Sequence, residues 1–205
     1  MDFPLGRECG NGNEVAESVE ALRGGGPADL RELTLRLGAE MLVLGGAAPD
    51  IAAATSRLEQ ALASGAALDK FREMVVAQGG NASVCDVPAD VLVQPKMRVP
   101  YVATRDGVVQ QVNALAVGRG ITALGGGRQA MEDRIDHSVG FTMRAIPGDS
   151  VRAGDVLAEI LAADSDGASA GRAALDEAIT IGDAPVLLPP LISHRVTSAG
   201  VERVG

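Results

Sequence analysis

A change in the spacing of apolar residues near residue 80 constrains the fold of this 205-residue chain more than any other feature. Before it, apolar residues recur every three or four positions and glycines separate the runs, which indicates amphipathic helices. After it, apolar residues alternate or form short clusters between prolines and glycines, which is typical of strands. The pattern predicts a helical first part, a boundary between residues 80 and 100, and a strand-rich second part.

The helical part divides into four predicted helices. Their approximate ranges are 14–22, 27–44, 49–63 and 68–77. The second helix carries one long apolar stripe, formed by Leu30, Leu33, Leu37, Met41 and Leu44. A stripe of this kind normally packs into a protein core, and we predict that it is buried.

The second part reads as a compact α+β domain. Short strand pieces are predicted from Val108 to Leu124, a strand-turn unit spans Val151–Ile160, and a last helix is predicted from Ala168 to Ile181. A proline-rich segment follows this helix, with Pro185, Pro189 and Pro190.

Composition excludes several classes of function. The net charge is −9 and the aromatic content is 2%, so the chain has neither the clustered cations nor the stacking rings of nucleic-acid binding proteins. No apolar run approaches the ~20 residues of a membrane span, and no signal peptide is recognisable, which predicts a cytoplasmic protein. Cys9 and Cys85 have no metal-binding spacing, and a disulfide between them is not favoured.

Taken singly, the local motifs identify no catalytic or ligand-binding site. The glycine-rich stretch 118–128 matches no phosphate-binding motif, so we interpret it as a structural loop. His137 stands beside Asp136 but has no nucleophile near it in sequence, and His194 is expected to be solvated. Glu14 and Glu17 lie at a helix start, where the helix dipole alone would stabilise each by ~0.3–1 kcal/mol.

Several motifs together resemble thymidine and pyrimidine-nucleoside phosphorylases over nearly the whole chain. They are MDFPLGRECGNGNEVAE, GGGPADLRELTLRLGAEML, LDKFREMVVAQGG, GGGRQAMEDRIDHSVGF and GDSVRAGDVL. In that family the opening motif lies in mid-chain, which implies that this chain corresponds to the C-terminal portion.

The resemblance implies a fold class of α/β and α+β. Residues 1–80 would be the helical remainder of the central α/β domain, 81–100 a linker, 101–195 the C-terminal α+β domain and 196–205 a tail. Within the C-terminal domain, the turn-strand units at 105–109 and 148–157 resemble the hammerhead, or barrel-sandwich, element of biotinyl and lipoyl carriers. No lysine lies between these units, so attachment of such a group is not expected.

The family reversibly cleaves thymidine with phosphate to thymine and 2-deoxyribose 1-phosphate, as a homodimer. The phosphate loop and the base-binding residues of the family are not in this chain, so we assign no catalytic or substrate-binding residue. The resemblance implies that the chain is inactive alone and needs the missing N-terminal portion. The alternative is a non-catalytic interaction module that reuses the C-terminal fold.

The resemblance also implies half of a potassium site. Leu5 and Glu8 would each supply a backbone carbonyl oxygen and Glu17 its carboxylate, and the remaining ligands would come from the phosphate-loop region. Glu8 stands where the family has a small apolar residue, and Asn13 where it usually has leucine.

Overall fold

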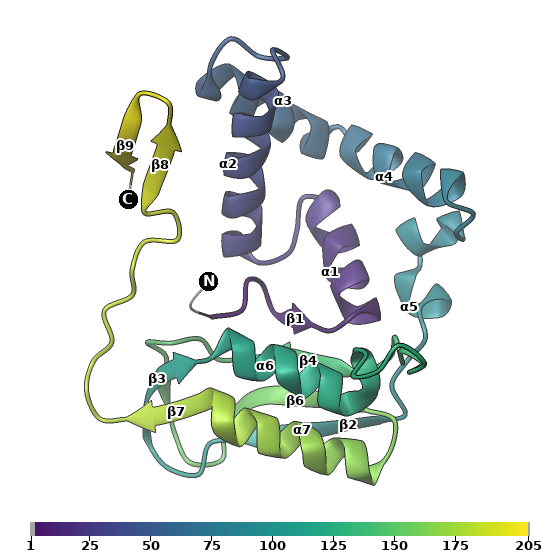
Figure 1. The fold of residues 1–205 in the computed structure, drawn as a ribbon, viewed down its shortest axis with the longest axis vertical. Coiled ribbons are helices and arrows are strands. Elements are labelled where there is room, and N and C mark those ends of the chain that lie inside the picture. The colour runs from purple at the N-terminus through teal and green to yellow at the C-terminus, as the bar shows by residue number, and fades with distance from the viewer. Residues whose placement is uncertain (1–2, 205) are drawn as a thin grey trace.

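A computed structural model describes residues 3–204; Met1, Asp2 and Gly205, at the ends of the expected first domain and tail, lie outside the described residues. The molecule combines helices with antiparallel sheets, which confirms the mixed fold class. Figure 1 shows the helices α1 to α5 as an arch above a layered part made of sheets and two helices.

The helices of the arch follow the predicted ranges closely. They are α1 (Gly12–Leu22), α2 (Ala28–Leu44), α3 (Ile51–Ala63) and α4 (Ala66–Ala77). Asp50 caps α3 by accepting a hydrogen bond from the Ala53 amide, and Gly65, at φ 82°, makes the sharp turn between α3 and α4. A 3₁₀ turn (Ala82–Cys85) and the short α5 (Pro88–Val91) complete the arch.

Within residues 3–204 the strands form three antiparallel sheets. The first has the order β1-β4-β6-β2, with β1 (Glu8–Cys9), β4 (Gly140–Met143), β6 (Val156–Ala162) and β2 (Met97–Val102). The second has the order β5-β3-β7, with β5 (Ser150–Val151), β3 (Gly107–Val112) and β7 (Ile179–Gly182). The third is the hairpin of β8 (His194–Thr197) and β9 (Gly200–Arg203). The opening segment of the chain therefore supplies an edge strand to a sheet built from residues far along the sequence.

The main core lies between these sheets and the helices α6 (Ala114–Ile121) and α7 (Ser165–Ala178). Phe141, Leu157, Ile160 and Leu175 are among its fully buried side chains. Gly171 lets α7 approach β6 closely, because a Cβ atom there would lie 2.6 Å from the Ile160 side chain.

Two predictions in this part are wrong in detail. The stretch read as strand pieces after Val112 forms helix α6, because Asn113 caps it through hydrogen bonds from the Leu115 and Ala116 amides and α7 packs against it. The last helix ends at Ala178 instead of Ile181, because Ile179 begins β7 and pairs with β3.

The prediction of a buried stripe on α2 is also wrong over the second half of that helix. Leu37, Met41 and Leu44 are exposed. Helix α2 instead turns Leu35, Gly38 and Ala39 inward, and Gly38 makes room for the Leu58 side chain of α3. Small residues at a helix contact let two helices approach closely. Helix α2 therefore packs through the face that carries Gly38 and Ala39, and the three larger apolar side chains stay exposed.

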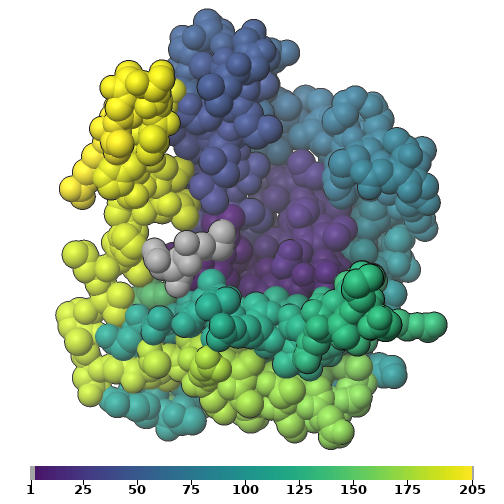
Figure 2. Space-filling view, in the orientation of Figure 1, coloured from purple at the N-terminus to yellow at the C-terminus, as the bar shows by residue number. Residues whose placement is uncertain are grey.

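The end of the chain folds back onto the arch. After β7 an irregular strap, residues 183–193, runs along one side of the molecule to α2 (Figure 1). The Arg195 guanidinium then donates two hydrogen bonds to the Glu40 carboxylate on α2, at 2.7 and 2.9 Å. Figure 2 shows this tail as a yellow column beside α2.

Candidate functional site

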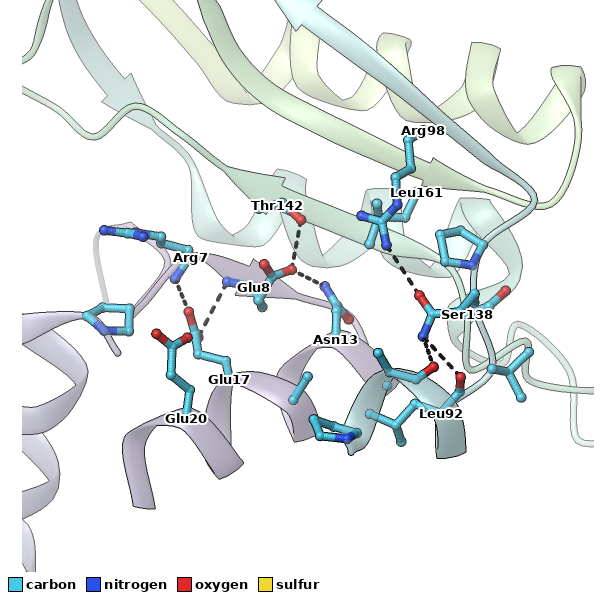
Figure 3. Close-up of a pocket in the computed structure, with 18 of the residues that line it drawn as sticks. Arg7, Glu8, Asn13, Glu17, Glu20, Leu92, Arg98, Ser138, Thr142 and Leu161 are labelled. Carbon is cyan, nitrogen blue, oxygen red and sulfur yellow. Dashed lines mark hydrogen bonds between the residues drawn. The ribbon is translucent and has the colours of Figure 1, made fainter. Parts of the chain in front are cut away.

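The loop that opens the chain and helix α1 are joined by Glu17. This side chain is buried, and its carboxylate accepts hydrogen bonds from the backbone amides of Arg7, at 2.9 Å, and Glu8, at 3.4 Å (Figure 3). Leu5 lies in the same loop and is half-buried. The structure thus brings Glu17 beside the loop that carries Leu5 and Glu8, the three residues of the predicted cation half-site.

Gly6 makes this arrangement sterically feasible. Its φ of 71° lies in the left-handed region, and a Cβ atom there would lie 2.5 Å from a carboxylate oxygen of Glu17. Its amide donates to the Asp29 carboxylate at 3.0 Å, which ties the turn to the first turn of α2.

The surroundings of Glu17 favour an added positive charge. Burial raises the pKa of the Glu17 carboxyl above its ordinary value, and the charges of Glu8 and Asp29 act in the same direction. The two backbone hydrogen bonds from Arg7 and Glu8 oppose that rise. A hard monovalent cation would offset the burial of the ionised form, and carboxylate and carbonyl oxygens are the ligands such a cation prefers.

No cluster of three or more histidine, cysteine, aspartate or glutamate side chains within residues 3–204 could hold a metal ion. The predicted half-site depends instead on the two backbone carbonyls of Leu5 and Glu8 with the single carboxylate of Glu17. It stays a prediction.

The Glu8 side chain belongs to a second network, which sequence reasoning missed. Its Oε2 atom accepts hydrogen bonds from Asn13 Nδ2 at 2.9 Å and Thr142 Oγ1 at 2.8 Å. Asn13 Nδ2 also donates to the Phe141 carbonyl at 3.1 Å, and Asn13 Oδ1 accepts from the Asn11 amide at 3.1 Å. Glu8 and Asn13, the two residues expected from the sequence to differ from the family pattern, therefore pair with each other. The only sign of this pairing in the sequence was that both residues are polar and lie five positions apart.

A cavity of about 330 Å³ lies between α1 and α5 on one side and the first sheet, β1 included, on the other. Glu17 and Glu20 of α1 line one wall, and Arg98 of β2 lines another (Figure 3). Arg144, which follows β4, also lines the cavity. Arg144 donates to Glu159 at 2.8 Å, so part of its charge is already balanced. Sequence reasoning did not single out Arg98 or Arg144, because neither stands in a motif.

The other candidate residues have structural roles or none that is visible. The His137 carbonyl accepts a hydrogen bond from the Gly12 amide at 3.0 Å, and the glycine-rich loop accepts one from the Asn11 side chain at the Gly126 carbonyl, at 2.8 Å. Both contacts hold the start of α1. Cys9 and Cys85 are free and buried, and burial raises the pKa of the Cys9 thiol to about 12, which makes it a poor nucleophile.

Comparison with known proteins gives consistent matches. Residues 108–182 match the sequence model of the pyrimidine nucleoside phosphorylase C-terminal domain. The chain is 43% identical over 197 residues to thymidine phosphorylase of Burkholderia cenocepacia, a match that covers 96% of this chain and 45% of that protein. It is 38% identical over 197 residues to pyrimidine-nucleoside phosphorylase of Geobacillus stearothermophilus, with the same coverage, and 41% identical over 160 residues to that of Staphylococcus haemolyticus, covering 78% of this chain and 37% of that protein.

These matches confirm the resemblance seen in the sequence motifs. The chain spans about 45% of the length of the Burkholderia cenocepacia and Geobacillus stearothermophilus relatives that it matches. Within residues 3–204 no helix combines the length and the apolar character needed to cross a bilayer.

Proposed function

The chain is a relative of the thymidine and pyrimidine-nucleoside phosphorylases, and we propose that it forms the C-terminal portion of such an enzyme. Together with the portion that carries the phosphate loop and the base-binding residues, it would reversibly cleave thymidine with phosphate to thymine and 2-deoxyribose 1-phosphate. The assembled enzyme would be a cytoplasmic homodimer. The observation that carries the proposal is the match to a thymidine phosphorylase over 96% of this chain.

In this proposal the chain contributes support for an active site and not the reacting groups. Its loop of residues 5–8, held by Glu17 through the Arg7 and Glu8 amides, would form one side of a potassium site. A potassium ion there would supply positive charge near the phosphate. Phosphorolysis of a nucleoside depends on anion positioning and on stabilising a positively charged sugar, so it requires groups that the other portion would bring.

Activity measurements test the proposal. The purified 205-residue chain should release no thymine from thymidine and phosphate. Co-expression with the part of the Burkholderia cenocepacia enzyme outside the match should give a complex that releases thymine in a phosphate-dependent and potassium-dependent reaction. In that complex Glu17→Gln should weaken the potassium dependence, while Glu14→Gln, an exposed change on the same helix, should not.

Two results would contradict the proposal. Strong thymine release by the pure chain would show that it is not an inactive portion. A stoichiometric complex with no phosphorylase activity would favour the alternative, an interaction module that reuses the C-terminal fold.

A further inference from the structure

Three large apolar side chains stand on one exposed face of α2. Leu37, Met41 and Leu44 are 55%, 72% and 85% exposed. Their spacing of four and three residues places them on a single face of the helix. With Leu33, one turn earlier, they form what we call the α2 stripe.

The rest of the described chain leaves Leu37, Met41 and Leu44 exposed, because α2 packs through its opposite side, where Leu35 and Ala39 are buried. Glu40, at the edge of the stripe between Leu37 and Leu44, pairs with Arg195 of the tail hairpin. The arch also lacks an extended core of its own: α3 buries only Ala54, α4 buries no residue, and the main buried cluster lies in the sheet part. Contiguous exposed apolar faces of this kind commonly mark protein interfaces.

The α2 stripe is continuous with the loop of the predicted cation site. Leu33 and Leu5 line the same cavity, of about 520 Å³, between α2, the opening loop and the strap. A polypeptide that completes the site at Leu5 could therefore extend along the stripe.

We propose that the α2 stripe is the docking surface for the polypeptide that makes up the rest of the phosphorylase. The inference rests on the proposed function. More than half of each curated relative lies outside its match to this chain, so the relatives contain ample polypeptide to cover the stripe. A second copy of the chain is a poorer occupant, because each copy carries a net charge of −9 and two copies repel each other.

The test compares two triple variants of the full chain. The stripe variant is Leu37→Gln, Met41→Gln and Leu44→Gln. The matched control is Met131→Gln, Leu187→Gln and Val201→Gln, which removes the same number of well-exposed apolar side chains elsewhere. Because all six side chains are exposed, both variants should keep the circular dichroism spectrum and the melting temperature of the unmodified chain.

Binding is measured by titration against the part of the Burkholderia cenocepacia enzyme outside the match. This partner is co-expressed with the chain and then separated from it, or the co-purified pair is used directly. The stripe variant should bind about 100-fold more weakly, and the control within about threefold of the unmodified chain. Hydroxyl-radical oxidation supplies a second measurement: Met41 should become protected in the complex, while Met131 should not.

Equal binding by the two variants, or full oxidation of Met41 in the complex, would overturn the inference. Self-association of the unmodified chain that the stripe variant abolishes would overturn it in favour of a second copy. These readouts are separate from activity: an inactive complex with a protected Met41 would contradict the proposed function alone, and an active complex with an unprotected Met41 would contradict this inference alone.

Discussion

The pairing of Glu8 with Asn13 predicts strong energetic coupling between the two positions. Asn13→Leu removes the donor to the Glu8 carboxylate, the donor to the Phe141 carbonyl and the acceptor of the Asn11 amide. Glu8→Ala removes the acceptor shared by Asn13 and Thr142. Each substitution alone leaves partly buried polar groups with fewer partners, and both should destabilise the chain.

The magnitude of the coupling follows from the shared bond. A hydrogen bond to a charged group contributes about 1.5–3 kcal/mol, and the Glu8–Asn13 bond is lost in either single variant but only once in the double variant. The loss of stability in Glu8→Ala/Asn13→Leu should therefore be smaller than the sum of the two single losses by about 1.5–3 kcal/mol.

Urea unfolding followed by circular dichroism measures the free energy of unfolding of the four proteins in this cycle. The control cycle pairs Glu8→Ala with Tyr101→Phe, because the Tyr101 hydroxyl bonds to Asp176 and shares no partner with Glu8. Its two effects should add to within about 0.5 kcal/mol. The same additivity in the Glu8 and Asn13 cycle would refute the reasoning, since it would show that the two side chains share no bond in solution.

Two further predictions concern Glu17 and the tail. Because the folded-state pKa of Glu17 is raised, the folded chain holds this proton more tightly than the unfolded chain, and Glu17 adds stability at low pH that is lost as pH rises from about 4.3 through the folded-state pKa. Glu17→Gln should abolish this pH-dependent loss. The free energy of unfolding of the variant, measured by urea unfolding, should therefore rise relative to that of the unmodified chain as the pH increases through this range. Parallel curves of unfolding free energy against pH would contradict the prediction. Arg195→Lys keeps the charge but not the two-pronged bond to Glu40, so it should speed limited proteolysis of the strap with little change in the stability of the whole chain. An unchanged cleavage rate would show that the bond does not hold the tail.

The sequence predicted the parts of the fold that depend on local pattern. Helices α1 to α4 appear at the predicted places, because their periodicity and their bordering glycines act within a few residues. Helix α6 was missed because Gly118, Gly120 and Val117 are poor helix formers, and its stability comes from the Asn113 cap and from α7. The α2 stripe was predicted to be buried because periodicity identifies an apolar face but cannot say whether the chain contains its partner.

The candidate site also has one part that could be predicted from the sequence and one part that could not. Resemblance to the phosphorylases placed Leu5, Glu8 and Glu17 together, and the structure brings the loop of the first two against the third. The link from Glu8 to Thr142 joins residues 134 positions apart, and nothing in the local sequence of either residue indicates the other. A contact of that range depends on the whole topology.

The place of β1 at the edge of the first sheet has a consequence for the order of folding. Helices α1 to α4 depend on local contacts and can form as soon as their residues leave the ribosome, but β1 has no partner until β4 has been made. Translation at about 5–20 residues per second separates the two strands by on the order of ten seconds. During that interval β1 stays unpaired, and it joins the sheet only when β4 reaches it.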